Sequence, residues 1–159
     1  MQKKYIALFI GSLIVFSFML IQFNVELKGS EFGSFTSYDL DQVYLLSMHL
    51  DQKSPIPIKL VAVEITDENG NKLVDSELPF EWRVWIDNES TIGAIRISEN
   101  EIENKEDNVP GYKISSEKIK LVKYIKRIRK TVVDEGYYIK ITYKLWGIKH
   151  HEIYPFVSM

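Results

Sequence analysis

Two adjacent histidines followed by a glutamate, His150-His151-Glu152, are the side chains of this sequence best suited to binding a metal ion. A zinc site usually needs three or four ligands that converge on one point. Neighbouring residues on a strand point to opposite faces, so this pair chelates poorly. The chain has no cysteine, which excludes a thiolate ligand, a thiol nucleophile and a disulfide framework. The sequence therefore predicts no metal site and no cofactor, and it places the histidines in a solvated turn.

Carboxylates are frequent, but no pattern marks any of them for acid–base catalysis. Asp39 and Asp41, or Glu81 and Asp87, are spaced so that two carboxylates can approach each other. General acid catalysis needs a desolvated carboxyl group, and nothing around these residues predicts one. The sequence has neither a glycine-rich phosphate loop nor a Gly-x-Ser-x-Gly elbow. We therefore expect no enzymatic activity, with a tethered or secreted hydrolase as the alternative.

Charge is segregated in the second half of the chain. Residues 99–107 hold five acids and one lysine, whereas residues 113–130 hold eight basic residues and one acid. A basic run of this kind can bind lipid headgroups or an anionic polymer. The residues that we expect to make such a contact are Lys120, Lys123, Lys126, Arg127 and Lys130. The alternative is a solvated edge strand whose lysines prevent edge-to-edge pairing.

Three aromatic residues, Trp85, Tyr138 and Trp146, are predicted to point outward from strands. Together they form a candidate patch that stacks on a sugar or contacts a protein. The alternative is that they cover a second sheet or stack across strands. The net charge of the whole chain is −2, which argues against a nucleic-acid partner.

The elements that must position these side chains are mostly strands. From about residue 42 onward, short apolar runs alternate with turn residues, which is typical of an all-β domain. The alternation is clearest in residues 43–50, 80–87 and 137–146. Residues 118–133 also fit helical spacing; we favour a strand for the second half of this run, and 116–126 stay open between strand and helix.

Turn residues then join these runs into a sandwich. Asn69-Gly70 predicts a hairpin after residues 58–66, and Asp134-Glu135-Gly136 predicts another before Tyr137. Six to eight short strands in about 120 residues predict a β-sandwich that resembles the immunoglobulin class in architecture. Trp82, which points inward from a mid-chain strand, is the candidate for its central core tryptophan.

The strongest signal lies at the N-terminus, where residues 5–23 are 19 consecutive residues without a charge. As a helix they span about 28 Å, close to the hydrocarbon thickness of a bilayer. We interpret residues 1–4 as a cytoplasmic stub, 5–23 as a transmembrane helix, 24–38 as a juxtamembrane linker and 39–159 as an extracytoplasmic β-sandwich domain. Lys3 and Lys4 precede the helix and indicate this orientation. No good cleavage site follows, so we expect an uncleaved anchor, although cleavage stays open.

These features predict a class of protein rather than a specific activity. The composition, 45% hydrophobic and 26% charged, excludes a disordered chain. We expect a single-pass protein of the cell membrane whose outer domain is a non-enzymatic accessory module. Its partners are the membrane and an unknown protein or an anionic surface polymer. Besides the hydrolase, the alternative is a small subunit of a membrane complex.

Overall fold

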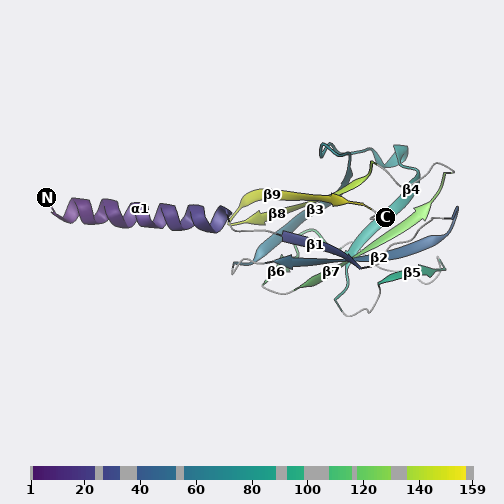
Figure 1. The fold of residues 1–159 in the computed structure, drawn as a ribbon, viewed down its shortest axis with the longest axis horizontal. Helices are drawn as coiled ribbons and strands as arrows, with labels where there is room; N and C mark the ends of the chain where they lie inside the picture. Colours follow the sequence, from purple (N-terminus) through teal and green to yellow (C-terminus); the bar gives the residue numbers. More distant parts are fainter. Residues whose placement is uncertain are drawn as a thin grey trace.

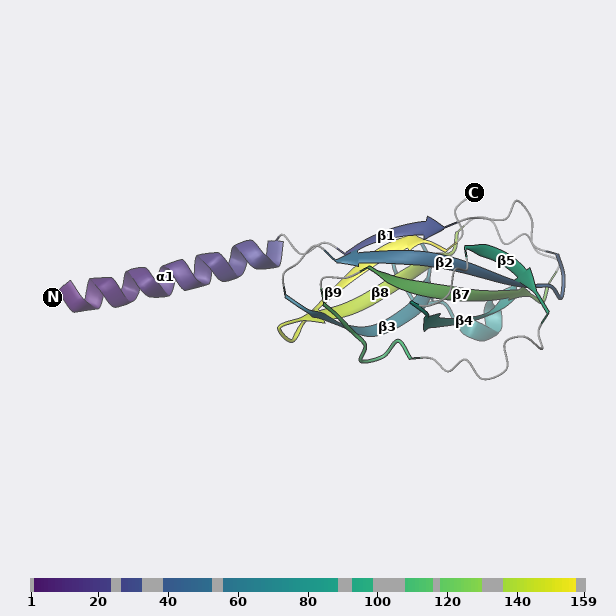
Figure 2. The same ribbon diagram turned by 90° about the horizontal axis from the view of Figure 1, so that it is seen from below.

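The computed structural model describes residues 2–23, 27–32, 39–52, 56–88, 93–98, 108–115, 118–129 and 136–156. Within these residues, one long helix precedes a domain of nine strands (Figures 1 and 2). The elements in chain order are α1 (Gln2–Phe23), β1 (Leu27–Phe32), β2 (Val43–Gln52), β3 (Ile58–Thr66), the 3₁₀ turn η1 (Asp75–Glu77), β4 (Phe80–Ile86), β5 (Ala94–Ile97), β6 (Lys113–Ile114), β7 (Ile119–Arg127), β8 (Tyr138–Leu145) and β9 (Ile148–Pro155).

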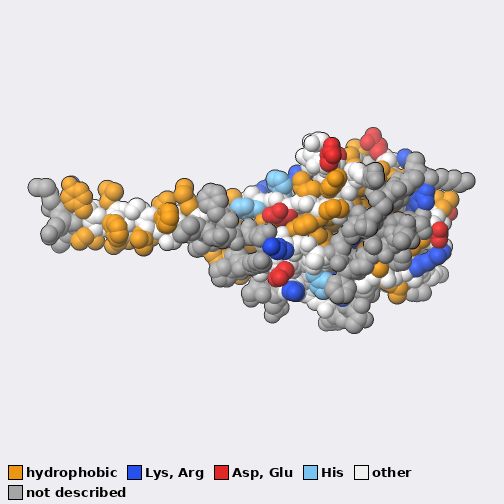
Figure 3. Space-filling view, in the orientation of Figure 1, with side chains coloured by type: hydrophobic (Ala, Val, Ile, Leu, Met, Phe, Trp, Pro, Cys, Tyr) orange, Lys and Arg blue, Asp and Glu red, His pale blue; other side chains and the backbone are white. Residues whose placement is uncertain are grey.

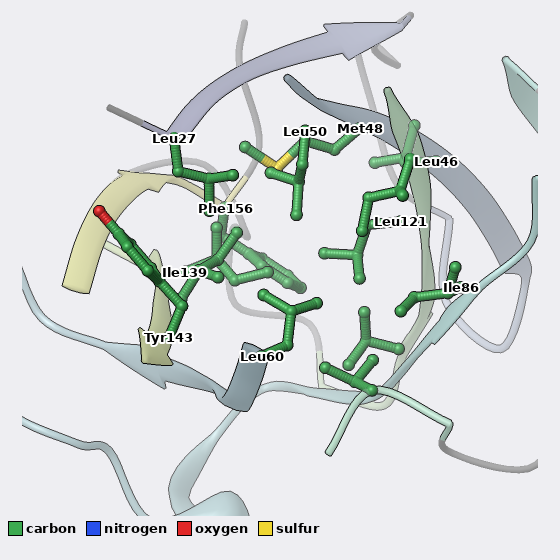
Figure 4. Packing of buried hydrophobic residues seen from close by; sticks show 14 of the residues in the cluster. Leu27, Leu46, Met48, Leu50, Leu60, Ile86, Leu121, Ile139, Tyr143 and Phe156 are labelled. Atoms are coloured by element: carbon green, nitrogen blue, oxygen red, sulfur yellow. The ribbon is translucent and has the colours of Figure 1, made fainter. Parts of the chain in front are cut away.

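The strands form two antiparallel sheets, so the predicted mainly β class is confirmed. One sheet has the order β1-β2-β7-β4. Strand β5 belongs to the same sheet and pairs with the first residues of β2, from Val43 to Leu46, whereas β1 pairs with the rest of β2, from Ser47 to Gln52. The other sheet has the order β6-β3-β8-β9. Their inner faces carry apolar side chains that meet in a single core between the sheets (Figure 4).

The core follows from period-two alternation along the strands. On β2, the inward residues Tyr44, Leu46, Met48 and Leu50 are the ones that the sequence places on one face, and all four are buried. On β8, every second residue from Ile139 to Leu145 is buried, as predicted. Each such apolar side chain contributes roughly 1.5–3 kcal/mol of burial free energy.

The predicted linker over residues 24–38 is wrong for residues 27–32, which form strand β1. This strand pairs with β2 in a register that runs from Leu27 opposite Gln52 to Phe32 opposite Ser47. The glycine and serines of the segment indicate a loop when only local propensity is considered. Pairing with a strand that lies some 20 residues later overrides that propensity, as the register shows.

Residues 119–127 form strand β7, so the stretch 116–126 that stayed open is a strand where the structure describes it. The strand expected for the second half of 118–133 ends at Arg127, and residues 130–133 lie outside the described residues. This strand pairs with β2 on one side and β4 on the other. The predicted hairpin between this run and 137–146 is also wrong, because β8 pairs with β3 and β9 in the other sheet. The chain crosses between the sheets here, and Gly136 supplies a positive φ of 102° just before β8.

The turn after β3 contains the predicted Asn69-Gly70, with φ +78° at Gly70. Asp67 accepts hydrogen bonds from the backbone of Asn69 and from both the backbone and the side chain of Asn71. Those bonds, led by the Asn71 side chain, hold the pKa of the Asp67 carboxyl below its usual value. The expected return strand reduces to a single bridge between Thr66 and Lys72.

A second tight turn joins β8 to β9. Its two residues, Trp146 and Gly147, both have positive φ, 49° and 85°, as in the two-residue hairpins whose twist matches the strands. Strand β9 begins at Ile148, directly after this turn. His150 and His151 therefore lie on β9 and not in a solvated turn.

Helix α1 projects away from the sandwich in both ribbon views (Figures 1 and 2). The large apolar side chains that the structure describes on this helix are each more than half exposed (Figure 3), and these are Tyr5, Ile6, Leu8, Phe9, Ile10, Leu13, Ile14, Val15, Phe16 and Met19. Among the residues that the structure describes, no helix combines the length and the apolarity needed to cross a membrane. The helix is thus confirmed from Gln2 onward, and its place in a membrane stays a prediction.

Gly29 of β1 is a position where the two sheets approach closely. A Cβ added there meets the ring of Tyr154 at 2.9 Å and the end of the Met48 side chain. We expect Gly29→Ala to lower the free energy of unfolding by about 1–2 kcal/mol through overpacking. Ser30→Ala, at the exposed neighbouring position, serves as the control and should change stability by about 0.5 kcal/mol or less. Equal stabilities of the two variants in urea unfolding would contradict the close approach.

Candidate functional site

Among the strands that the structure describes, β4 lies at the edge of its sheet, with β7 as its one neighbour. It pairs on one side with β7, from Phe80 opposite Arg127 to Ile86 opposite Leu121. The backbone N–H of Asp87 donates to the carbonyl of Lys120 at 3.0 Å. Backbone groups alternate in direction along an antiparallel strand. The N–H and C=O groups of Trp82, Val84 and Ile86 therefore point away from β7.

Asn108 occupies this edge at one position. Its side-chain oxygen accepts from the backbone N–H of Ile86 at 2.7 Å, and its side-chain nitrogen donates to the carbonyl of Ile86 at 3.1 Å. This pair of bonds is the one that a neighbouring peptide group makes in a sheet. Within the described part of the chain, the edge groups of Trp82 and Val84 have no such partner.

A groove of about 500 Å³ lies beside this part of the edge. It opens between the two sheets, where the half-buried Val63 of β3 faces the half-buried Trp82 of β4. The exposed side chains of Glu81 and Arg83 lie at its rim, and Ile128 lies at one end. The groove thus combines an apolar floor, charged rim residues and unpaired strand edge groups.

Trp82 does not take the central core position that the sequence suggests. It points toward the core from β4, but it is only half-buried because β4 is an edge strand. Its indole N–H donates to Asp75 at 3.2 Å, and its ring meets Phe156 edge to face with centroids 6.5 Å apart. These contacts fix the indole as one wall of the groove.

The basic residues predicted to share one surface are separated by the sandwich. Lys120 and Lys126 lie on the outer face of their sheet, six residues apart along β7, or about 20 Å. Arg127 lies at the end of the strand and donates from Nε to the carbonyl of Arg129 at 2.8 Å. Lys130 falls outside the described residues.

The prediction that Lys123 contacts an external surface is wrong, because this residue lies in the core. Its side chain has no exposed surface, and its Nζ donates to the carbonyl of Phe156 at 2.7 Å. The ammonium group also lies 5.6 Å from the centre of the Phe156 ring. Alternation on β7 gives the reason: Lys123 has the same phase as the buried Leu121 and Ile125. It is therefore unable to contact an external surface.

The three outward aromatic residues do not form one patch. Trp85 faces outward from its sheet but is buried in a second cluster with Val43, Leu45, Val122 and Tyr124. Tyr138 is half-buried at the start of β8 in the other sheet. Trp146 lies at the far end of β8 and is 51% exposed. The prediction of a shared aromatic surface is thus wrong for Trp85 and finds no geometric support for the other two.

His49 lies in a different sheet from the adjacent His150 and His151 of β9. His150 stacks on Tyr143 with ring centroids 5.5 Å apart, and the Tyr143 hydroxyl lies 3.4 Å from Glu152. His49 lies on β2 in the other sheet, where burial and the nearby charges of Lys120 and Lys118 lower its pKa. In the described ranges, no three histidine or acidic side chains converge as a metal site requires.

Asn108 and Val63 are the site residues that sequence reasoning missed. Asn108 lies just before the Pro110-Gly111 turn and gives no local sign that it reaches the edge of β4, 22 residues earlier. Val63 follows a register shift between Leu60 and Ala62, which turns its side chain toward the groove. A bulge of this kind is hard to predict from the sequence, because the hydrophobic pattern changes by only one position.

Comparison with known proteins returns no match to a family model, to a curated protein or to a solved structure.

Proposed function

We propose that this chain is a membrane-tethered, non-enzymatic binding module whose sandwich takes up an extended segment of a partner protein along β4. The observation that carries the proposal is the free stretch of the β4 edge beside an apolar groove. Strand addition uses such an edge: main-chain hydrogen bonds supply affinity, and pockets for alternate side chains supply specificity.

The edge has room for two further backbone pairs beyond Asn108. A peptide that continues from the Asn108 amide would pair with the N–H and C=O groups of Val84 and then Trp82, which point away from β7. Each hydrogen bond formed this way is worth about 0.5–1.5 kcal/mol net. The alternation of a bound strand would place one side chain in the groove between Val63 and Trp82, where an apolar or aromatic group fits best.

Tethering is the second part of the proposal. The apolar side chains of α1 have no described cover on any side of the helix, and a helix that is apolar all round is normally buried in protein or lipid. We propose that lipid covers it, with the N-terminus in the cytoplasm, the β domain outside and the protein in the cell membrane. The positive residues before the apolar segment support this orientation.

We also propose that the sandwich is immunoglobulin-like. Its strand order supports this, because β1, β2, β7 and β4 follow one another as strands A, B, E and D do in that class. Likewise, β3, β8 and β9 follow the order C, F, G. The short strands β5 and β6 are additions at the sheet edges.

Hydrogen exchange of the β4 amides tests the free edge directly. In the full chain in detergent micelles, we expect the amides of Arg83 and Trp85 to be protected, since they pair with β7. The amides of Trp82 and Val84 should exchange at least tenfold faster, because none of the described strands pairs with them. Equal protection along β4, measured by nuclear magnetic resonance, would mean that the edge is already occupied.

Peptide selection tests the function itself. Displayed peptides selected on the full chain should include binders that slow exchange at Trp82 and Val84. Val63→Phe fills the groove and should weaken such binders at least tenfold, whereas Ala62→Phe introduces the same side chain on the outer face and should not. Binders that leave the Trp82 and Val84 amides unprotected, or that respond equally to both variants, would contradict the proposal.

A further inference from the structure

Four lysines line up across the second sheet, from one edge to the other. The register places Lys113 of β6 opposite Lys59 of β3, Lys59 opposite Lys144 of β8, and Lys144 opposite Lys149 of β9. At the usual spacing between strands, the row spans about 14 Å. Opposed residues of neighbouring strands share a face, so the four side chains leave the same side of the sheet. We refer to these residues as the lysine row.

Within the described part of the chain, no acidic side chain forms an ion pair with the lysine row. Three of its lysines are exposed, and Lys144 is half-buried. Two ion pairs occur among the described residues, Lys72 with Glu64 and Arg96 with Asp39, and neither involves the row. The adjacent row on the same face holds Ala62, Thr142 and His151, and no acid. Like charges directly opposite one another destabilise a sheet, so an external negative charge would relieve this repulsion.

The row lies at the end of the domain that adjoins α1. Lys144 and Lys149 flank the β8–β9 turn, which lies at this end in both ribbon views (Figures 1 and 2). On the face drawn in Figure 3, side chains of lysine or arginine, histidine and acidic residues lie interspersed near the junction with the helix. If α1 lies in a bilayer, the lysine row faces the headgroups of that bilayer.

Two exposed apolar side chains project from the same turn. Trp146 is 51% exposed and Ile148 is 45% exposed. Tryptophan is enriched at the level of lipid headgroups, where its ring suits a boundary between apolar and polar surroundings. The turn thus presents an apolar tip with lysines immediately behind it, which is a combination that suits shallow contact with an anionic membrane.

We propose that the lysine row and the Trp146–Ile148 turn dock the domain onto anionic lipid headgroups of the membrane that holds α1. Docking fixes the orientation of the sandwich relative to the bilayer, so that the β4 edge points in a defined direction. The inference rests on the anchoring proposed above. It does not depend on which peptide binds at β4.

The test uses the full chain with a single introduced cysteine. The sequence has no cysteine, so Ile148→Cys carries one environment-sensitive fluorophore. The labelled protein is reconstituted into vesicles of phosphatidylcholine alone or mixed with phosphatidylglycerol. We expect blue-shifted emission only with phosphatidylglycerol, and loss of the shift at high salt, which screens the charges.

Charge variants identify the residues responsible. Lys59→Gln with Lys149→Gln should lower the ratio of docked to undocked protein about thirtyfold, at roughly fivefold for each lysine near an anionic surface. Lys72→Gln with Arg96→Gln removes the same charge from exposed side chains at the other end of the sheets and should leave the ratio unchanged.

The outcomes separate the two proposals. Suppose that the full-length protein floats with both kinds of vesicle. If its emission is then independent of lipid charge, or changes equally in both double variants, the docking inference is wrong and the anchor is still supported. Protein that floats with neither kind of vesicle overturns the anchor, and the docking inference with it.

Discussion

Replacing Lys123 by alanine is expected to lower the free energy of unfolding by about 3–5 kcal/mol. The side chain is fully buried between the sheets, and its Nζ donates to the carbonyl of Phe156 at 2.7 Å. Truncation removes that donor from a buried carbonyl and leaves a cavity where the three outer methylenes and the terminal nitrogen of the lysine packed. Urea unfolding of the full chain in detergent micelles, followed by tryptophan fluorescence, measures the loss.

Two further variants separate the causes of this loss. Lys123→Met keeps most of the buried stem and removes only the charge and the donor, so the loss should fall to about 2 kcal/mol or less. Lys120→Ala changes a residue of the same strand that points to the other face, and its effect should stay within about 0.5 kcal/mol. Similar small losses for Lys123→Ala and Lys120→Ala would show that the ammonium group is not held in the core.

The burial of Lys123 also shows where sequence reasoning reaches its limit. A run of eight basic residues predicts a charged surface, because most lysines are exposed. Period-two alternation would have placed Lys123 on the buried face, together with Leu121 and Ile125. That inference requires the run to be assigned to a strand first. Helical spacing competed with that assignment, since Leu121 and Ile125 are four residues apart.

The parts of the fold that were predicted correctly are those in which one face of a strand is buried and the other is not. The face of β8 and the inward face of β2 follow directly from such alternation. Strand β1 was missed because nothing in its own sequence requires a strand; its backbone is held by the register with β2. Connections between strands were the weakest inference, as the crossing from β7 to β8 shows.

The candidate sites depend on pairings that no local pattern contains. The lysine row joins residues from positions 59 to 149, which become neighbours only through the register of four strands. The free edge of β4 depends in the same way on which strand lies at the end of the sheet. The sequence predicts a basic contact surface along β7, whereas the surface that we propose to contact lipid lies on the other sheet.

Two aspartates in α1, Ile10→Asp with Ile14→Asp, are expected to release the chain from membranes. These positions lie four residues apart on one face, near the middle of the apolar segment. An aspartate at the centre of an inserted helix costs about 2.5–3.5 kcal/mol, and the lost isoleucine adds about 0.5 kcal/mol. The double variant should therefore shift the partition toward water by a factor of about 10⁴ or more, as measured by carbonate extraction and flotation of the full chain.

Val74→Asp with Ile95→Asp provides the matched control, because both residues are apolar and exposed but belong to the β domain. This variant should stay with the membrane fraction as the unmodified chain does. Release of the unmodified chain by carbonate would contradict the anchor, because a lipid-covered helix resists that treatment.

Retention of the α1 variant would instead assign membrane binding to the domain, and the lysine row would then have to supply most of the attraction on its own. Four lysines at about 1 kcal/mol each give only about 4 kcal/mol, a reversible and salt-sensitive association, so washing with salt distinguishes that case from an anchored chain.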